Sequence, residues 1–450
     1  MSQQDYGGFP SVDVLFDKDA RLLDEAVKQH VAQMIESNGV TDLVAVSHGW
    51  NNNIPEAANL YARLFDRVRA QLDGKGIAGL SDRTFGVMAI FWPSKRFTDE
   101  DAIPGGAAAA EDARAEQIKA TLDNLSDLFR ERGLADEVQE AKNLVVDLEE
   151  DEAAQNRFVA IVSGLLSDSP EPDNGIDQLS LVAAEDGHEV LQALQGLTVG
   201  VVGQPTRASD FDSGGATELP DLDEPDGMGS AAGLGGIFNT IKDAALGLLN
   251  VTTYATMKDR AGVIGRVGVA PTLDSVQGAY PALRLHLVGH SFGGRLVTSA
   301  AAATSSQIAT MTLLQAAYSH YGLAEKYDGR HDGFFRAVLA QRKVRGPILI
   351  SHSVHDKAVG LAYPIASRLL RQQSNAFGDQ NDPFGGMGRN GAQKTPEVPD
   401  PNGLLKPAGS AYDLRNGVPN NLNGDQIIQS HGDICRDEIA YATLLGISRA

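Results

Sequence analysis

Residues 285–304, LHLVGHSFGGRLVTSAAAAT, decide the fold. The apolar run 285–288 is typical of a strand buried on both faces, and the small residues at the end of the stretch favour a helix. Between them stands a G-x-S-x-G motif centred on Ser291. In this motif the serine occupies a sharp, strained turn that exposes its hydroxyl above the sheet, and the flanking residues Gly289 and Gly293 avoid a collision because they lack a Cβ. The stretch therefore predicts that Ser291 is a nucleophile.

The rest of the chain alternates between strand and helix patterns. Helical patterns cover residues 22–35, ended by Asn38-Gly39, and the segment that Pro55 opens. Short apolar runs occur at 12–16, 43–46, 86–91, 310–314 and 347–350. Such alternation predicts an α/β fold with a mainly parallel sheet and helices on both faces. Chemistry in such folds occurs at the carboxyl ends of the strands, so the residues after each run are the candidates.

Two stretches differ in composition from this pattern. Residues 97–250 are rich in Ala, Glu, Asp and Leu at helical spacing, which predicts a mainly helical insertion. Within it, residues 204–236 are acidic and rich in Gly and Pro, which predicts a disordered loop. Residues 374–410 have no usable period and predict a flexible loop within the core. The core domain is accordingly predicted to be discontinuous, with residues 1–96 and 251–450.

Composition excludes several classes of protein. Lys and Arg number 38 against 59 Asp and Glu, a net charge of −21, which argues against nucleic acid as a partner. The single cysteine, Cys435, excludes an intramolecular disulfide and a zinc site of cysteine type, and we expect neither metal nor cofactor. The first residues lack the basic start and apolar core of a signal peptide, and no apolar stretch is long enough to cross a bilayer. These features predict a soluble, cytoplasmic protein.

A serine nucleophile needs a histidine base and a carboxylate to orient it, and with this motif they follow the serine in the order acid, then histidine. Asp356 lies just past the predicted strand 347–350 and is the best candidate for the acid. A turn aspartate that caps the next helix is the alternative interpretation, and Asp332 is the rival acid. His431 is the last histidine of the chain and lies before an apolar C-terminal helix, so it is the predicted base. His352 is disfavoured because it precedes the acid.

Acyl transfer also needs donors for the developing oxyanion. The backbone N–H of Phe292, directly after the serine, is the predicted first donor. An earlier strand is followed by His48-Gly49-Trp50, a turn whose glycine lets the backbone approach a substrate, and the N–H of Trp50 is the predicted second donor. His48 and Gly49 support this turn. Asn51–Asn53 either buttress it by hydrogen bonds or form an ordinary polar loop.

Five blocks of the sequence resemble, in order, those of the α/β-hydrolase superfamily, and more narrowly those of bacterial serine-esterase or lipase-like hydrolases. The blocks are Ser47-His48-Gly49-Trp50-Asn51-Asn52, Phe91-Trp92-Pro93-Ser94, Val288-Gly289-His290-Ser291-Phe292-Gly293, His355-Asp356-Lys357-Ala358 and His431-Gly432. The resemblance implies an α/β-hydrolase fold with a Ser-Asp-His triad and no cofactor, and a cap formed by the insertion 97–250. Some relatives carry an aspartate where this chain has Gln315, which removes a rival acid and favours Asp356.

These observations predict a serine hydrolase that cleaves carboxylic esters, with a small-molecule or lipid ester as substrate. A peptidase or a thioesterase that uses the same triad is the nearest alternative. From another class, a non-catalytic relative that binds a protein through its acidic insertion stays an alternative, although such a protein has no need of all three triad residues.

Overall fold

The computed structural model describes residues 5–74, 76–94, 110–131, 133–164, 186–194, 240–356, 358–359 and 385–450. The loop predicted to be disordered, 204–236, lies outside these residues, as does the part 374–384 of the second predicted loop. The part of that loop from 385 to 410 carries a short helix and several buried residues, so it packs against the core.

An α/β fold is formed around an eight-stranded sheet with the order β1-β2-β4-β3-β5-β6-β7-β8. All neighbouring strands are parallel except β1 and β2. The strands are β1 Asp5–Tyr6, β2 Phe9–Leu15, β3 Asp42–Ser47, β4 Phe85–Phe91, β5 Arg284–His290, β6 Ile308–Leu314, β7 Ile348–His352 and β8 Pro419–Asn423. The six predicted strands are confirmed, whereas β1 and β8 were not predicted.

Side chains alternate along each central strand between two apolar clusters. In β3, Leu43 and Ala45 join one cluster, and Val44 and Val46 join the other. The first cluster includes residues of helices α1 (Val27–Asn38) and α10 (Phe292–Ala303), and the second includes residues of helices α2 (Ile54–Asp73) and α14 (Asp437–Ser448). Because both faces of the sheet are covered by helices, its strands are apolar throughout, as the short runs in the sequence predict.

The described helices are α1 Val27–Asn38, α2 Ile54–Asp73, α3 Ala110–Glu131, α4 Ala135–Leu144, α5 Glu152–Ser163, α7 Gly187–Leu194, α8 Ile241–Val263, α9 Ala270–Ala279, α10 Phe292–Ala303, α11 Arg336–Ala340, α13 Met387–Asn390 and α14 Asp437–Ser448. Asn53 and Glu56 form a capping box that begins α2, and Gly39 ends α1 with a φ of 61°. The helix predicted from residue 22 begins only at Val27, because Leu22 pairs with Phe16 in a β-bridge and the Leu23 N–H donates to the Leu15 oxygen.

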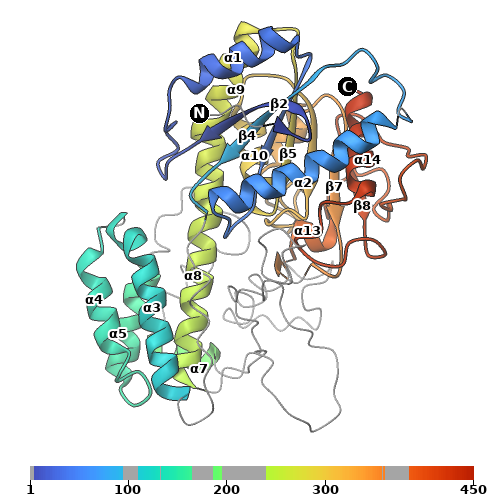
Figure 1. Cartoon of the computed structure of the whole chain (residues 1–450). Helices are drawn as coiled ribbons and strands as arrows, with labels where there is room; N and C mark the ends of the chain where they lie inside the picture. The colour runs from blue at the N-terminus through green and yellow to red at the C-terminus, as the bar shows by residue number, and fades with distance from the viewer. Residues whose placement is uncertain are drawn as a thin grey trace.

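The helical insertion lies to one side of the sheet (Figure 1), where α8 runs from the core to the group formed by α3, α4, α5 and α7. The predicted boundary at residue 250 falls inside α8, which is continuous from Ile241 to Val263. A π-helical segment, Ile264–Val269, joins α8 directly to α9. The insertion is therefore connected to the core by an unbroken run of helix.

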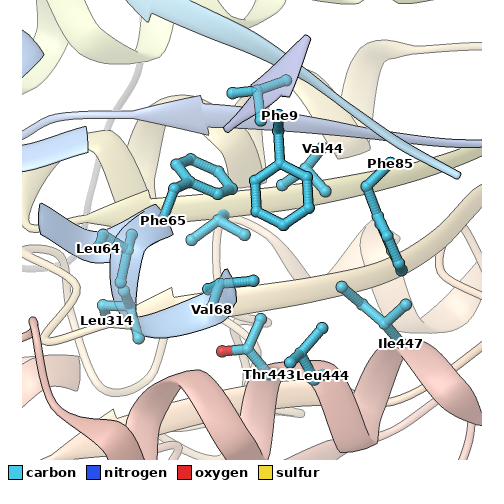
Figure 2. A pocket seen from close by; sticks show the side chains of 12 residues that line it. Phe9, Val44, Leu64, Phe65, Val68, Phe85, Leu314, Thr443, Leu444 and Ile447 are labelled. Atoms are coloured by element: carbon cyan, nitrogen blue, oxygen red, sulfur yellow. The ribbon is translucent and has the colours of Figure 1, made fainter. Parts of the chain in front are cut away.

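A small apolar pocket lies between the sheet, α2 and α14 (Figure 2). Its lining residues are Phe9, Val44, Leu64, Phe65, Val68, Phe85, Val87, Val288, Leu314, Thr443, Leu444 and Ile447. Thr443 contributes the one polar side chain among them, and none of the predicted site residues lines the pocket. Because ligand sites carry several convergent polar groups, we interpret this pocket as a packing gap in the core.

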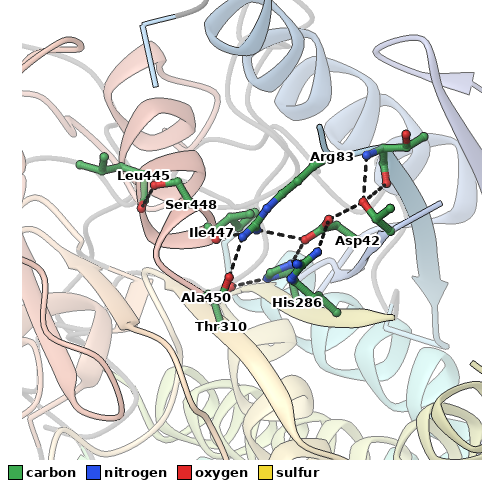
Figure 3. A network of polar contacts seen from close by, with 11 residues as sticks. Asp42, Arg83, His286, Thr310, Leu445, Ile447, Ser448 and Ala450 are labelled. Carbon is green, nitrogen blue, oxygen red and sulfur yellow. Dashed lines mark hydrogen bonds and ion pairs between the residues drawn. The ribbon is translucent and has the colours of Figure 1, made fainter. Parts of the chain in front are cut away.

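A buried polar network fastens the end of the chain to the amino ends of the strands (Figure 3). Asp42 accepts hydrogen bonds from His286 Nε2, at 2.9 Å, and from Arg83, which also binds the Ile447 and Ala450 carbonyl oxygens. Burial opposes ionisation of Asp42, but the hydrogen bonds from His286 and from its neighbouring threonine outweigh it and hold the pKa of Asp42 below its usual value. Burial lowers the pKa of His286, so the pair is a carboxylate and a neutral imidazole.

Within the described residues, no helix combines the length and the apolar character needed to span a membrane.

Candidate active site

Ser291 lies on a strained turn between β5 and α10. Its φ of 57° and ψ of −124° belong to a region that residues with a Cβ rarely adopt. The turn is tight because backbones approach closely: a Cβ on Gly289 would lie 2.3 Å from the Gly293 oxygen, and one on Gly293 would lie 2.2 Å from the Ser47 oxygen. Strain at a serine in this position has the geometry of a nucleophile elbow.

Backbone hydrogen bonds fix this turn to the neighbouring strand. The Ser291 N–H donates to the Leu314 oxygen at 3.0 Å, and the Ser291 oxygen accepts from the Ala317 N–H at 3.0 Å. The Ser291 side chain makes no capping hydrogen bond at the start of α10. The backbone hydrogen bonds, and not the hydroxyl, therefore fix the turn.

Asp356 and His431 are brought together at the carboxyl edge of the sheet. His431 Nδ1 lies 2.9 Å from Asp356 Oδ2, and both side chains are buried. The other carboxylate oxygen, Oδ1, accepts the N–H of Val359 at 3.0 Å, so the aspartate also caps the next turn. Because the carboxylate can accept a hydrogen bond from Nδ1–H, this pairing leaves Nε2 as the acceptor, which is the tautomer that a general base needs.

The rival residues lie elsewhere. Asp332 is exposed and accepts the N–H of Lys326 at 2.9 Å. His352 Nδ1 lies 3.4 Å from the Arg389 oxygen, and burial lowers its pKa to about 4. Of these candidate acids and bases, Asp356 and His431 are the ones that form a pair.

The predicted flexible loop contributes to the environment of Asp356. A Cβ added to Gly388, in α13, would lie 2.6 Å from Asp356 Oδ2. The Gly388 oxygen accepts the N–H of Ser353, and its N–H donates to the Ala316 oxygen. This contact buries the acid, and nothing in the sequence pattern predicted it.

Side-chain donors bind the carbonyl oxygens of the loop after β3. Asn52 Nδ2 donates to the oxygens of Gly49, at 3.3 Å, and Trp50, at 2.9 Å. His48 Nδ1 donates to the Gly49 oxygen at 2.8 Å and Nε2 accepts the N–H of Trp92, which assigns the neutral tautomer. Burial lowers the pKa of His48 to about 4. Of the two interpretations of the asparagines, Asn52 thus supports the turn.

Gly49 brings this loop against Ser291. A Cβ on Gly49 would lie 2.6 Å from the Ser291 Cβ and 3.1 Å from its Oγ. Phe292 is the first residue of α10, where an N–H has no acceptor within the helix. The two predicted oxyanion residues are thus the chain neighbours of Gly49 and Ser291, and the rings of Trp50 and Phe292 lie 6.0 Å apart between centroids.

No family model, curated protein or solved structure matches this chain.

Three residues near the site were missed as functional candidates. His290 and Gln315 both donate to the His431 oxygen, at 2.9 and 3.4 Å. Tyr254, on α8, packs its ring 4.7 Å from that of Phe292 and 5.8 Å from that of Trp50, measured between centroids. The sequence contained a signal for two of them, because His290 lies inside the G-x-S-x-G motif and Gln315 directly follows a predicted strand. It contained no signal that would have marked Tyr254 as a residue of the site.

Among the described residues, no cluster of three His, Cys, Asp or Glu side chains could hold a metal ion.

Proposed function

We propose that this protein is a serine hydrolase of the α/β-hydrolase fold that cleaves carboxylic esters through an acyl-enzyme. The observation that carries the proposal is the buried Asp356–His431 pair, 2.9 Å apart, whose histidine is hydrogen-bonded through its carbonyl oxygen to His290, the residue before the strained Ser291. The parallel sheet order and the strand-end positions of all three residues support the fold assignment.

In the proposed reaction, Ser291 Oγ attacks the ester carbonyl carbon while His431 Nε2 takes the hydroxyl proton. The carbonyl oxygen becomes an oxyanion, which the N–H groups of Phe292 and Trp50 stabilise. Collapse of the intermediate expels the alcohol, which receives the proton from His431. Water then attacks the acyl-enzyme with His431 again as base, and releases the acid. Asp356 stays ionised and stabilises the imidazolium.

The insertion acts in this proposal as a cap that selects the substrate. Its contact with the site runs through α8, whose Tyr254 lies against both oxyanion residues. Lipid or other apolar esters suit a site flanked by Trp50, Tyr254 and Phe292, because their rings bind acyl chains by apolar contact.

A panel of p-nitrophenyl esters graded by acyl length, together with a thioester and a peptide amide, tests the proposal. We expect hydrolysis of at least one ester and its loss in Ser291→Ala. Hydrolysis of the thioester or the amide alone would assign the site to a thioesterase or a peptidase. A folded protein that is inactive on the whole panel contradicts the proposal and favours a binding role.

A further inference from the structure

The main-chain carbonyl oxygen of His431 is held by two side chains from different elements. His290 Nε2, on the turn that carries the nucleophile, lies 2.9 Å from it, and Gln315 Nε2, just after β6, lies 3.4 Å from it. Both side chains are buried. We propose that His290 and Gln315 are positioning residues that fix the main chain of His431 and thereby aim its ring at Ser291. This inference rests on the proposed hydrolase function.

His290 acts as a donor and not as a second base. A carbonyl oxygen only accepts, so the proton of the imidazole is on Nε2, and Nδ1 carries a lone pair. Nδ1 is buried and has no hydrogen-bond partner among the described residues. Burial, with the nearby His431, lowers the pKa of His290 to about 3. A neutral ring 4.9 Å from that of His431 avoids repulsion when His431 takes up the serine proton.

Packing alone does not explain an imidazole at this position. An unbranched apolar side chain would fill the same space without the unpartnered buried Nδ1 of the imidazole. The hydrogen bond from Nε2 to His431 is the interaction that such a side chain would lose. The hydrogen bond to the His431 oxygen therefore explains why an imidazole occupies position 290.

Gln315 is oriented by its own partner. Its Oε1 accepts from Ser351 Oγ, in β7, at 2.7 Å, which turns the amide nitrogen toward His431. Its backbone is unusual as well, with a φ of 39° in a residue that is fully buried. The structure thus connects β7 through Gln315 to the loop of the base.

Hydrogen bonds at both the ring and the main chain fix the position of His431 better than a bond at the ring alone. The bond to Asp356 fixes Nδ1, but the ring could still swing about that bond if its backbone moved. The bonds to the carbonyl oxygen fix the backbone, and His290 is covalently next to Ser291, so one turn holds both nucleophile and base. A displacement of about 1 Å between reacting groups can lower a rate by about 10²-fold.

Four variants test the inference. His290→Met removes the donor, and His290→Gln keeps an N–H at similar reach. Gln315→Met removes the second donor in an isosteric side chain. His352→Met is the matched control, because His352 is another buried histidine bound to a backbone carbonyl, but not to that of His431. For each we measure kcat and KM on the best ester, the rate of fluorophosphonate labelling, and the thermal midpoint.

We expect His290→Met to lower kcat and the labelling rate about 10–100-fold, with KM changed by less than about 3-fold. Gln315→Met should lower both rates by a smaller factor, because its bond is longer. His290→Gln should restore most of the activity, and His352→Met should keep kcat near that of the wild type at a similar thermal midpoint.

Unchanged kcat in both His290→Met and Gln315→Met overturns the inference. If one of the two variants does not fold, an unchanged kcat in the other overturns it. The inference also fails if His290→Met and His290→Gln lower kcat equally, or if His352→Met lowers kcat as much as His290→Met does. Either result would show that the imidazole acts through the overall stability of the protein. The wild type separates the two proposals: if it neither hydrolyses esters nor labels, the hydrolase function fails and this inference with it. If it does both, the variants decide the inference alone.

Discussion

The strained backbone of Ser291 predicts that glycine stabilises this position relative to alanine, the reverse of its usual effect. At φ 57° and ψ −124°, a residue with a Cβ has a strain of about 1–3 kcal/mol, which glycine lacks. Against this, glycine gains conformational freedom in the unfolded chain, which costs about 0.4–1 kcal/mol. Ser291→Gly should therefore be more stable than Ser291→Ala by about 1 kcal/mol. Neither variant keeps the hydroxyl, so the comparison isolates the backbone.

Ser299 provides the matched control, because it is a buried serine in the interior of α10 whose hydroxyl has no partner among the described residues. There, Ser299→Gly should be less stable than Ser299→Ala by about 1 kcal/mol, as in other helices. Urea unfolding of the four variants, followed by the fluorescence of Trp50 and Trp92, measures both differences. The sign of the difference should reverse between the two positions.

A Ser291→Gly protein that is less stable than Ser291→Ala by the same amount as at Ser299 would refute the argument. Ser291 would then lie on relaxed backbone, and the turn would lose its resemblance to a nucleophile elbow.

Three further predictions concern the acid, the oxyanion loop and pH. Asp356→Asn should lower kcat by about 10⁴-fold because His431 then adopts the wrong tautomer, while Asp332→Asn leaves the steady-state kcat unchanged. Gly49→Ala should abolish fluorophosphonate labelling in a folded protein, since its Cβ would lie 2.6 Å from that of the nucleophile. Burial lowers the pKa of His48 to about 4 in the folded protein, whereas the unfolded chain takes up the proton near pH 6.5. The contribution of the neutral His48 to the free energy of unfolding is therefore fully present above pH 6.5 and is lost as pH falls toward 4. For His48 this loss amounts to roughly 2 kcal/mol between pH 7 and 5. Because burial lowers the pKa of His290 and His352 in the same direction, urea unfolding at the two values should show it as the part of the wild-type loss that a His48→Asn variant lacks.

The central strands could be predicted because burial on both faces leaves a continuous apolar run. β8, Pro419–Asn423, escaped prediction because its sequence is PNNLN. Two of its asparagines are buried but satisfied: Asn420 accepts the N–H of Arg415, and Asn421 donates to the Ala392 oxygen. A polar strand of this kind is specified by tertiary hydrogen bonds that a local pattern does not contain.

Candidate site residues could be predicted where they follow strands. Asp356 was identified because it follows a predicted strand of a parallel sheet, and His431 because it is the last histidine of the chain and fits the order serine, acid, histidine. The contribution of Gln315 could not be predicted. The resemblance indicated only that this position lacks the aspartate that some relatives carry, and the donor role of Gln315 depends on the orientation that Ser351 imposes. Tyr254 was missed because its contact with Phe292 depends on how α8 crosses the core.

The most direct test of the account is covalent labelling of the intact protein with a fluorophosphonate, followed by mass spectrometry of its peptides. We predict a single adduct, on Ser291, that forms in the wild type, disappears in Ser291→Ala and forms far more slowly in His431→Gln. An adduct on another serine, or none in a protein that is folded by its unfolding transition, would contradict the assignment of Ser291 as a nucleophile activated by His431.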